Sequence, residues 1–196
     1  MNDDEGLKPS ELRDRIHQAL SSRKPLSIEA RGRRRGAVLI ILYPDDDVKM
    51  IFTVRSQNVS EHKGQISFPG GSRERRDRSM IETAIRETYE ETGIRVSEDQ
   101  VVGRLDDALI SVSNFVVTPF VAFLETPPQP TPDEREITQI IEVPLSKLMD
   151  PDSLEERVME SQGKPVKSVV FTHGEHIIWG ATARMLMQFM EIIKDV

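Results

Sequence analysis

The 196-residue sequence contains no cysteine. Disulfide bonds, thiolate zinc sites and a cysteine nucleophile are therefore excluded, and any bound metal must be held by oxygen or imidazole ligands. Aromatic residues make up only 5% of the chain. The single tryptophan, Trp179, is in such a chain more often a core residue than a platform for a planar ligand.

The sequence also lacks long apolar runs and an excess of positive charge. Its first ten residues have neither the basic nor the apolar region of a secretory signal, and the longest apolar run, Ala37–Tyr43, is too short to span a bilayer. We therefore expect a soluble, cytoplasmic protein without a membrane partner. The net charge of -7 argues against a general nucleic-acid partner. An anionic substrate would need a metal ion or a few placed arginines.

The composition is that of a globular protein, with 37% hydrophobic and 30% charged residues. The length suits one domain with a short extension. We expect the extension to span residues 1–35, with a helix capped by Ser10 and a basic connector at Arg31–Arg35. The apolar residues of that helix recur at helical spacing: Leu12, Ile16 and Leu20. Residues 36–196 would form the main domain.

Strand-like and helical segments alternate in the main domain. Apolar and β-branched runs predict strands at Ala37–Tyr43, Met50–Arg55, Val101–Leu105, Phe115–Leu124, Ile137–Val143 and Val166–Phe171. The first two runs are separated by a turn-rich stretch and indicate a hairpin. Helical spacing predicts a closing helix over Gly180–Ile193. The pattern favours an α/β domain built on a mixed β-sheet.

A further helix contains the segment RETYEETGI, Arg86 to Ile94. A capping box formed by Ser79 and Glu82 opens this helix, and Gly93 closes it. Its packed face is predicted to carry Met80, Ile81, Ala84, Ile85 and Thr88.

Glu87, Glu90 and Glu91 lie at i, i+3 and i+4, so their carboxylates share one side of that helix. Two interpretations remain open. The side is solvated and its charge is offset by Arg86, or it is held ready for a cation.

Other catalytic motifs are missing from the sequence. Neither the phosphate loop ending in Lys-Ser or Lys-Thr nor the pattern GxGxxG occurs. His173 and His176 have the wrong spacing for a two-histidine zinc helix, and His17 and His62 have no ligand partner nearby in sequence. The glutamates remain, and hard cations such as Mg²⁺ or Mn²⁺ prefer carboxylate oxygens.

The segment PGGSRERRDRSMIETAIRETYEETGI, Pro69 to Ile94, resembles the Nudix box. Three features differ from the common form of that box: Thr88 replaces an aliphatic residue, Asp77 replaces glutamate, and Arg86 lies one residue farther from Gly71. The resemblance implies a Nudix-type α/β/α sandwich with a mixed central sheet. It also implies a hydrolase that cleaves a nucleoside diphosphate linked to another group.

The longer spacing is similar to that of the coenzyme A pyrophosphatase branch of this family. The branch signature matches IFTVRSQNVSEHKGQISFPGG, Ile51 to Gly71, with these residues in register: Thr53, Arg55, Ser56, Gly64, Phe68, Pro69, Gly70 and Gly71. Ser60 takes the place of the branch's internal arginine, while Arg55 and Lys63 remain as cations. Asp133–Leu145 and Ile177–Leu186 are also similar to the branch, so that the resemblance covers Gly36 to the C-terminus.

The resemblance implies roles for several residues. The metal ligands would be Glu87, Glu90 and Glu91, holding Mg²⁺ or Mn²⁺. Glu90 and Glu136 are rival candidates for the general base, and Arg86 would orient a carboxylate. The substrate would be bound by Arg55, Phe68, Gly70 and Gly71, with Phe68 a better stacking candidate than Trp179.

The expected reaction converts coenzyme A or a derivative to 3′,5′-ADP and 4′-phosphopantetheine. Alternatives within the fold are hydrolysis of ADP-ribose, of a dinucleotide or nucleotide sugar, or of a nucleoside triphosphate. A non-catalytic nucleotide-binding domain is an alternative of another class, but a binder gains nothing from three mutually repelling carboxylates. A prenyl-diphosphate isomerase is disfavoured because its chemistry usually calls on a cysteine. The partner is thus a small nucleotide, and the oligomeric state is left open, a homodimer included.

Overall fold

The computed structural model describes residues 8–56, 64–110 and 113–196, and its centre is a mixed eight-stranded β-sheet. The strands of this sheet are β1 (Arg34–Tyr43), β2 (Lys49–Arg55), β3 (Ile66–Ser67), β4 (Gly70–Ser72), β5 (Val101–Arg104), β6 (Ala108–Ile110), β7 (Phe115–Phe123) and β8 (Ile137–Pro144). The main path runs β3-β2-β1-β7-β5, with β4 on β1, β6 on β7 and β8 on β2. The central pair β1 and β7 is parallel, and the other pairs are antiparallel.

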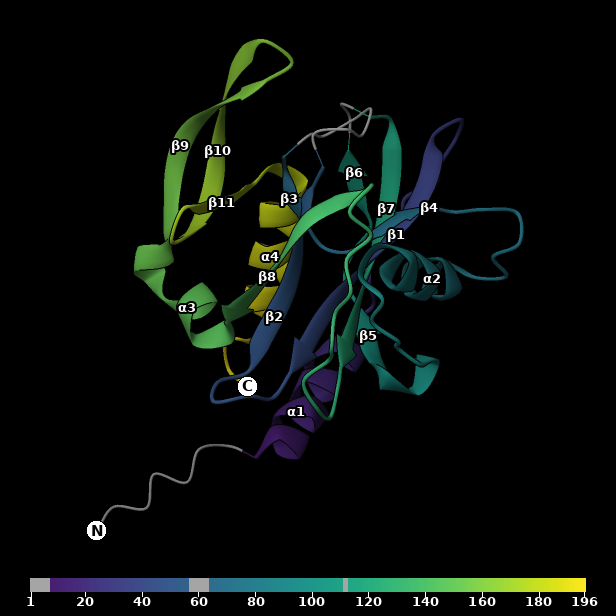
Figure 1. Ribbon diagram of the computed structural model, residues 1–196, viewed down its shortest axis with the longest axis vertical. Coiled ribbons are helices and arrows are strands. Elements are labelled where there is room, and N and C mark those ends of the chain that lie inside the picture. The colour runs from purple at the N-terminus through teal and green to yellow at the C-terminus, as the bar shows by residue number, and fades with distance from the viewer. Residues whose placement is uncertain (1–7, 57–63, 111–112) are drawn as a thin grey trace.

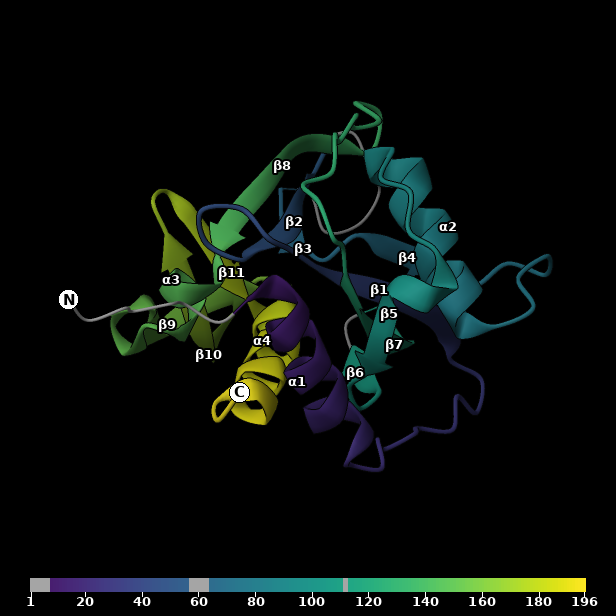
Figure 2. The ribbon, with the colours of Figure 1, turned by 90° about the horizontal axis from the view of Figure 1, so that it is seen from below.

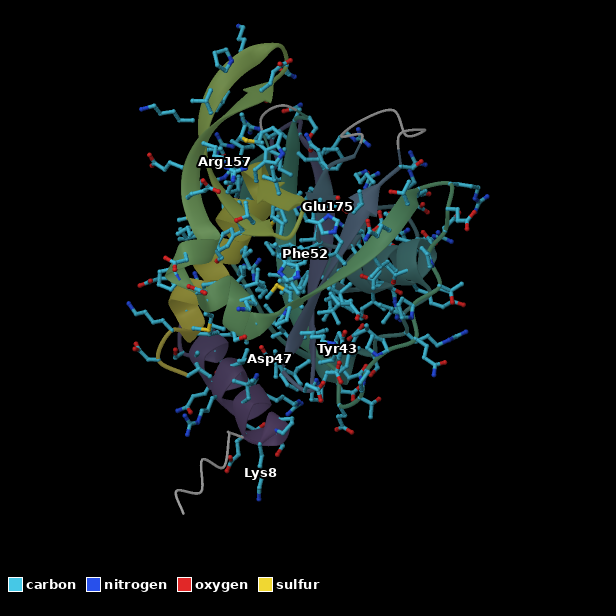
Figure 3. The ribbon with its side chains drawn as sticks, turned by 60° about the vertical axis from the view of Figure 1, so that its left-hand side comes forward. Lys8, Tyr43, Asp47, Phe52, Arg157 and Glu175 are labelled. Carbon is cyan, nitrogen blue, oxygen red and sulfur yellow. The ribbon has the colours of Figure 1, made fainter. Side chains whose placement is uncertain are left out.

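The helices and a second sheet surround this centre (Figure 1). The helices are α1 (Pro9–Ser21), α2 (Met80–Thr92), α3 (Leu145–Met149) and α4 (Gly180–Ile193), with short 3₁₀ turns at Glu98–Gln100 and Pro151–Ser153. The second sheet has the order β11-β10-β9 and consists of β9 (Leu154–Ser161), β10 (Lys164–His173) and β11 (His176–Trp179). Its β9–β10 hairpin projects beyond the body of the protein, and Arg157 marks that hairpin in Figure 3.

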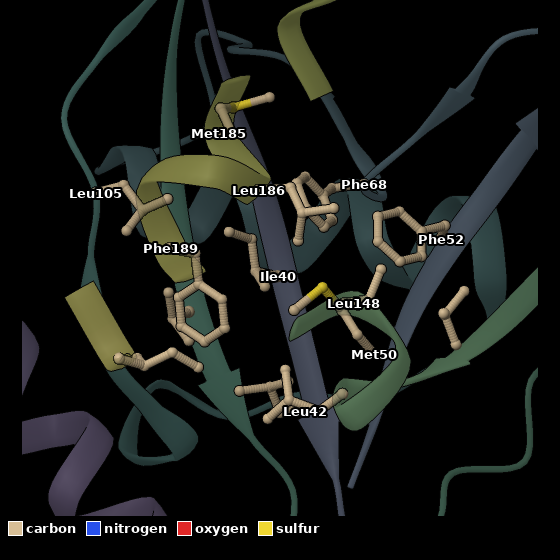
Figure 4. Close-up of a cluster of buried hydrophobic side chains, with 14 of the residues drawn as sticks. Ile40, Leu42, Met50, Phe52, Phe68, Leu105, Leu148, Met185, Leu186 and Phe189 are labelled. Carbon is tan, nitrogen blue, oxygen red and sulfur yellow. The ribbon is translucent and has the colours of Figure 1, made fainter. Parts of the chain in front are cut away.

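Strand β1 contributes to both hydrophobic layers because its side chains alternate between the two faces of the sheet. Leu39 and Ile41 pack in the cluster that includes Ala84 of α2. Ile40 and Leu42 pack on the opposite face with Leu186 and Phe189 of α4 and with α1 (Figure 4). Figure 2 shows α2 on one side of the sheet and α1 and α4 on the other. The predicted α/β/α sandwich with a mixed central sheet is confirmed.

Helix α1 packs into this core through Ile16 and Leu20, as its spacing predicted. The predicted cap was wrong, because the helix begins at Pro9 and its N-cap is Lys8, which leaves Ser10 inside the first turn. The connector after α1 is held by two neighbouring carboxylates. Asp106 accepts a hydrogen bond from the Leu26 amide at 2.8 Å, and Asp107 accepts one from the Ile28 amide at 2.9 Å. The boundary between residues 35 and 36 stays a prediction.

Most predicted elements are present, and those that were missed are short or polar. The predicted hairpin is formed by β1 and β2, with Leu42 paired with Met50, and the closing helix has its predicted bounds. Strands β3, β4, β6, β9 and β11 were not predicted. In β9, most side chains are exposed, so its sequence lacks the apolar alternation that marks a half-buried strand.

Candidate active site

Helix α2 begins and ends close to the predicted positions. Ser79 is the N-cap, and its hydroxyl accepts a hydrogen bond from the Glu82 amide at 3.1 Å. The reciprocal half of the predicted box is absent, because the Glu82 carboxylate instead accepts from the Arg78 amide at 2.6 Å. Gly93 ends the helix with φ of 69°, a left-handed conformation that favours glycine.

The packed face of α2 differs from the prediction. Ala84 and Thr88 are buried as predicted, but Ile81 and Ile85 are only half-buried, and Thr83, which was not predicted, is buried. The helix is thus rotated about its axis relative to the expected orientation. On this side of the helix, one of the three glutamates is buried against strand β4.

Glu91 is that glutamate, and its side chain is 2% exposed. Its carboxylate accepts a hydrogen bond from the Gly70 amide at 3.0 Å and one from Arg55 Nη1 at 3.3 Å. Burial raises the pKa of Glu91 to about 7, even though both donors oppose this effect. A nearby positive charge would therefore stabilise the ionised form strongly.

Glu87 lies beside it, against the next glycine of β4. Burial raises the pKa of Glu87 as well, and Arg86 Nη1 at 3.0 Å from the carboxylate opposes the rise. A Cβ atom added to Gly71 would lie 2.5 Å from Glu87 Oε2. Gly71 thus lets the backbone of β4 approach the carboxylate closely, as the sequence had suggested for a glycine near the metal site.

Glu90 is the most exposed of the three glutamates. Its side chain is 45% exposed, one oxygen accepts a hydrogen bond from Arg76 at 3.0 Å, and the other accepts one from Arg86 at 2.8 Å. Within the described residues, no three histidine or acidic side chains are grouped closely enough to hold a metal ion. Glu87 and Glu91 thus lie against strand β4. Glu90 lies on the same helix, and its carboxylate pairs with two arginines.

Arg86 joins α2 to the loop before it. Its guanidinium donates to both oxygens of Asp77 at 2.9 Å and to the backbone oxygen of Ser72 at 3.0 Å. It also forms ion pairs with Glu87 and Glu90. These contacts match the expectation that Arg86 orients carboxylates.

Asp77, a departure from the family pattern, anchors that loop. It is 4% exposed and accepts hydrogen bonds from the Glu74 amide at 2.8 Å and from Thr83 Oγ1 at 2.9 Å. The Arg86 guanidinium holds the pKa of Asp77 well below its usual range. The shorter side chain is therefore compatible with the arginine contact, and the loop is tied to α2 by a buried ion pair.

A cavity of about 950 Å³ opens between the eight-stranded sheet and the second sheet. One end of the cavity is lined by Arg55, Gly70 and Gly71, each of which contacts Glu87 or Glu91. The opposite wall is formed by the β9–β10 hairpin and the start of α4. The cavity is large enough for a cofactor-sized nucleotide, and the glutamates adjoin it through Arg55, Gly70 and Gly71 without being lining residues themselves.

Both candidate stacking residues line the cavity, and they differ in how deeply they are buried. The Phe68 side chain is 1% exposed and its ring stacks on that of Phe52, with centroids 4.9 Å apart, so Phe68 is a core residue. Trp179 is half-buried, and it lines the cavity at the start of α4. The sequence favoured Phe68 over Trp179 because Phe68 lies nearer to the box along the chain, and which of the two rings contacts the substrate stays a prediction.

Glu136 is exposed on the loop that precedes β8. This loop contacts the end of α2: the Asp133 amide donates to the Glu91 backbone oxygen at 2.9 Å. The backbone oxygen of Glu136 accepts from the Ser56 amide at 2.7 Å. The negative charge of Glu136 contributes to the raised pKa values of Glu87 and Glu91, which places it within electrostatic range of both.

The histidines have structural positions. His173 and His176 pair across the turn between β10 and β11, which agrees with their interpretation as strand ends. The ring of His17 hydrogen-bonds to the backbone oxygen of Val102 at 2.8 Å. Ser60, His62 and Lys63, on which part of the coenzyme A signature depends, lie outside the described residues.

Comparison with known proteins agrees with this geometry. The profile of the NUDIX domain matches residues 33–167, and the chain therefore belongs to the Nudix family. Proteins of the NudL group, described as uncharacterized Nudix hydrolases, are similar over most of the chain. The relative from Pectobacterium atrosepticum is 32% identical over 163 residues, which are 83% of this chain and 84% of that protein. The relative from Photorhabdus laumondii is 32% identical over 161 residues, 82% of this chain and 86% of that protein.

Solved structures support the fold. The MutT/nudix family protein from Enterococcus faecalis superposes with a TM-score of 0.57 at 15% identity, covering 96% of this chain and 75% of that one. The MutT protein from Methanosarcina mazei Go1 superposes with a TM-score of 0.53 at 16% identity, and the match covers 88% of this chain and 97% of that one. The protein is thus an enzyme of the Nudix pyrophosphohydrolase class. In the parts of the chain that the structure describes, no helix is long and apolar enough to cross a membrane.

Proposed function

We propose that the protein hydrolyses the diphosphate bond of coenzyme A or its derivatives, with Mg²⁺ or Mn²⁺, to 3′,5′-ADP and 4′-phosphopantetheine. The observation that carries the hydrolytic part is the placement of the buried Glu91 and the half-buried Glu87 against Gly70 and Gly71, which line a large cavity. The coenzyme A part rests on the signature from Ile51 to Gly71. Arg55 of that signature contacts Glu91 directly.

The donor set fits a divalent cation. Nudix hydrolases generally use divalent metal ions, and Glu91 and the half-buried Glu87 are carboxylates whose pKa values are raised by burial, so that a cation beside them would favour their ionised forms. Glu87, Glu91 and Glu90 would hold the ion, Glu90 after release from Arg76. A bound ion offsets phosphate charge and lowers the pKa of water.

The protein's own groups place the substrate. The glycines of β4 let a diphosphate approach the backbone closely, and Arg55 presents a cation at the same end of the cavity. Trp179 offers a half-buried ring to the adenine. Phe68 supports this arrangement from the core by packing on Phe52.

Glu136 and Glu90 remain the candidate proton acceptors. Both oxygens of Glu90 accept hydrogen bonds from arginines, which must be released before it takes a proton. The Glu136 carboxylate accepts no hydrogen bond from the described residues, and we therefore favour Glu136 as the base. Replacing Glu136 by Gln should remove the acidic limb of the pH–rate profile, whereas Glu90→Gln should chiefly raise the metal concentration required. The reverse pattern would assign the base to Glu90.

The proposed reaction is tested by incubating the protein with Mg²⁺ or Mn²⁺ and coenzyme A, its thioesters, ADP-ribose or NADH. Chromatography should detect 3′,5′-ADP together with 4′-phosphopantetheine. Cleavage of ADP-ribose alone would refute coenzyme A specificity, but the assignment of the protein as a diphosphate hydrolase would still hold. Absence of turnover with every substrate and either metal would instead favour a non-catalytic nucleotide-binding domain.

A further inference from the structure

The cavity carries an excess of positive charge that the diphosphate site does not use. The residues that line it include four cations, Arg34, Arg55, Lys167 and Arg184, and one carboxylate, Glu160. This contrasts with the net charge of -7 for the whole chain. Arg55 pairs with Glu91, whereas within the described residues no carboxylate forms an ion pair with the other three cations.

Two of these cations converge at the same end of the sheet. Arg34 on β1 pairs with Phe115 on β7, and Phe115 pairs with Ile110 on β6. Two strand spacings place the backbones of Arg34 and Ile110 about 10 Å apart. Arg184 reaches this end from α4, because its Nη2 donates to the backbone oxygen of Leu109 at 3.4 Å. Two extended arginine side chains can therefore contact one anion between them.

Both arginines lie on the α4 face of the sheet. The Arg34 guanidinium stacks 4.2 Å from the centroid of the Phe115 ring, and Phe115 packs against the hydrophobic cluster that contains Leu186 of α4. Arg34 Nη2 also donates to Ser72 Oγ at 3.2 Å. These contacts hold the guanidinium in place, which reduces the entropy lost when an anion binds.

This pair of arginines lies beside the diphosphate end of the cavity. Ser72, which contacts Arg34, directly follows Gly71, and Gly71 lies against Glu87. In coenzyme A, a single ribose separates the 5′-diphosphate from the 3′-phosphate. A second phosphoryl group of the same nucleotide would therefore lie one ribose away from the diphosphate, on the side of Ser72 and Arg34.

We propose that Arg34 and Arg184 form a phosphate-monoester subsite that binds the ribose 3′-phosphate and selects coenzyme A over its 3′-dephospho form. This inference rests on the proposed function. The planar guanidinium groups suit a phosphate because each can donate two parallel hydrogen bonds. The subsite gives specificity through a group remote from the bond that is cleaved.

The test compares kcat/KM for coenzyme A and 3′-dephospho-coenzyme A in each variant. Loss of a charge-assisted hydrogen bond costs on the order of a tenfold change in kcat/KM. We expect the wild type to favour coenzyme A, and Arg184→Gln and Arg34→Gln each to reduce the ratio about tenfold. Arg184→Lys should retain part of the preference. Arg15→Gln, an exposed arginine on α1, is the matched control and should retain all of it.

Binding measurements separate this inference from the proposed reaction. Calorimetry with 3′,5′-ADP and with 5′-AMP requires no turnover. Tighter binding of 3′,5′-ADP that is lost in Arg184→Gln would support the subsite even if coenzyme A were not hydrolysed. Equal binding of the two nucleotides, or an equal loss of activity toward both coenzyme A substrates in the variants, would overturn it while leaving the hydrolase intact.

Discussion

Replacing Glu91 by glutamine should stabilise the metal-free protein and at the same time abolish metal-dependent turnover. The glutamate is 2% exposed, and burial raises its pKa to about 7 from the ordinary 4.5. One pKa unit corresponds to about 1.36 kcal/mol, so the ionised carboxylate costs the folded state about 3 kcal/mol. Glutamine has a similar shape, can still accept from the Gly70 amide and carries no charge to bury.

The difference in stability between Glu91→Gln and the wild type depends on pH. Below pH 4.5 the Glu91 carboxyl is protonated in both the folded and the unfolded chain, and the two proteins should have similar stability. Between pH 4.5 and 7 the unfolded chain loses this proton while the folded protein keeps it. Wild-type stability therefore falls relative to the variant, and the full difference is present above about pH 7.

The measurement is urea unfolding of metal-free protein at pH 8 and pH 5. We expect Glu91→Gln to exceed the wild type by about 3 kcal/mol at pH 8 and by much less at pH 5. Glu134→Gln, at an exposed position, should show no such difference. Added Mg²⁺ should stabilise the wild type and not the variant, because the ion offsets the buried charge only in the wild type.

Two results would contradict this reasoning. If Glu91→Gln were less stable than the wild type at pH 8 without metal, the carboxylate would be well satisfied by Arg55 and the Gly70 amide. If the variant kept its metal-dependent activity, Glu91 would not be a metal ligand.

Four further substitutions concern helix α2, strand β4 and the loop between them. Asp77→Asn should lower the free energy of unfolding by about 3 kcal/mol because it leaves Arg86 without its buried partner. Since the pKa of Asp77 lies below its usual range, its contribution is complete above about pH 4, and urea unfolding should show the same loss at pH 5 and pH 8. Thr88→Val should stabilise the protein by about 1 kcal/mol, because the buried Thr88 hydroxyl has no hydrogen-bond partner among the described residues; a loss of stability would show that it has one. Gly70→Ala should unfold at markedly lower temperature because Gly70 has φ of 147° and a Cβ would meet the backbone of β1. Gly71→Ala should lose activity with a smaller change in melting temperature, because its Cβ would meet only a flexible carboxylate.

Much of the site could be predicted from local spacing, but the orientation of each side chain could not. The positions i, i+3 and i+4 placed Glu87, Glu90 and Glu91 on one side of a helix, and all three are there. The pairing of Glu90 with Arg76, which lies in the preceding loop, could not be predicted in this way. A contact across a loop leaves no periodic signal in the sequence.

The burial of the two candidate stacking residues could not be predicted for a related reason. Phe68 precedes the glycines of β4 and was expected at the ligand, but its ring packs against Phe52 across the β2–β3 pair. Trp179 is far away in sequence and is brought to the cavity by the pairing of β11 with β10. Side-chain proximity in a mixed sheet follows from strand order, which pattern alone does not give.

The error in the packed face of α2 has a functional reason. Helical periodicity predicted that Ile81 and Ile85 would be buried, and burying both would maximise the apolar area removed from water. Besides the predicted Thr88, whose hydroxyl has no partner among the described residues, the helix buries Glu91, whose charge is costly to bury. Each of these choices lowers stability, and together they bring a carboxylate to the amide of Gly70 beside the cavity. Local rules of packing are thus violated on the face of α2 that the proposed metal site requires, as expected where function and stability compete.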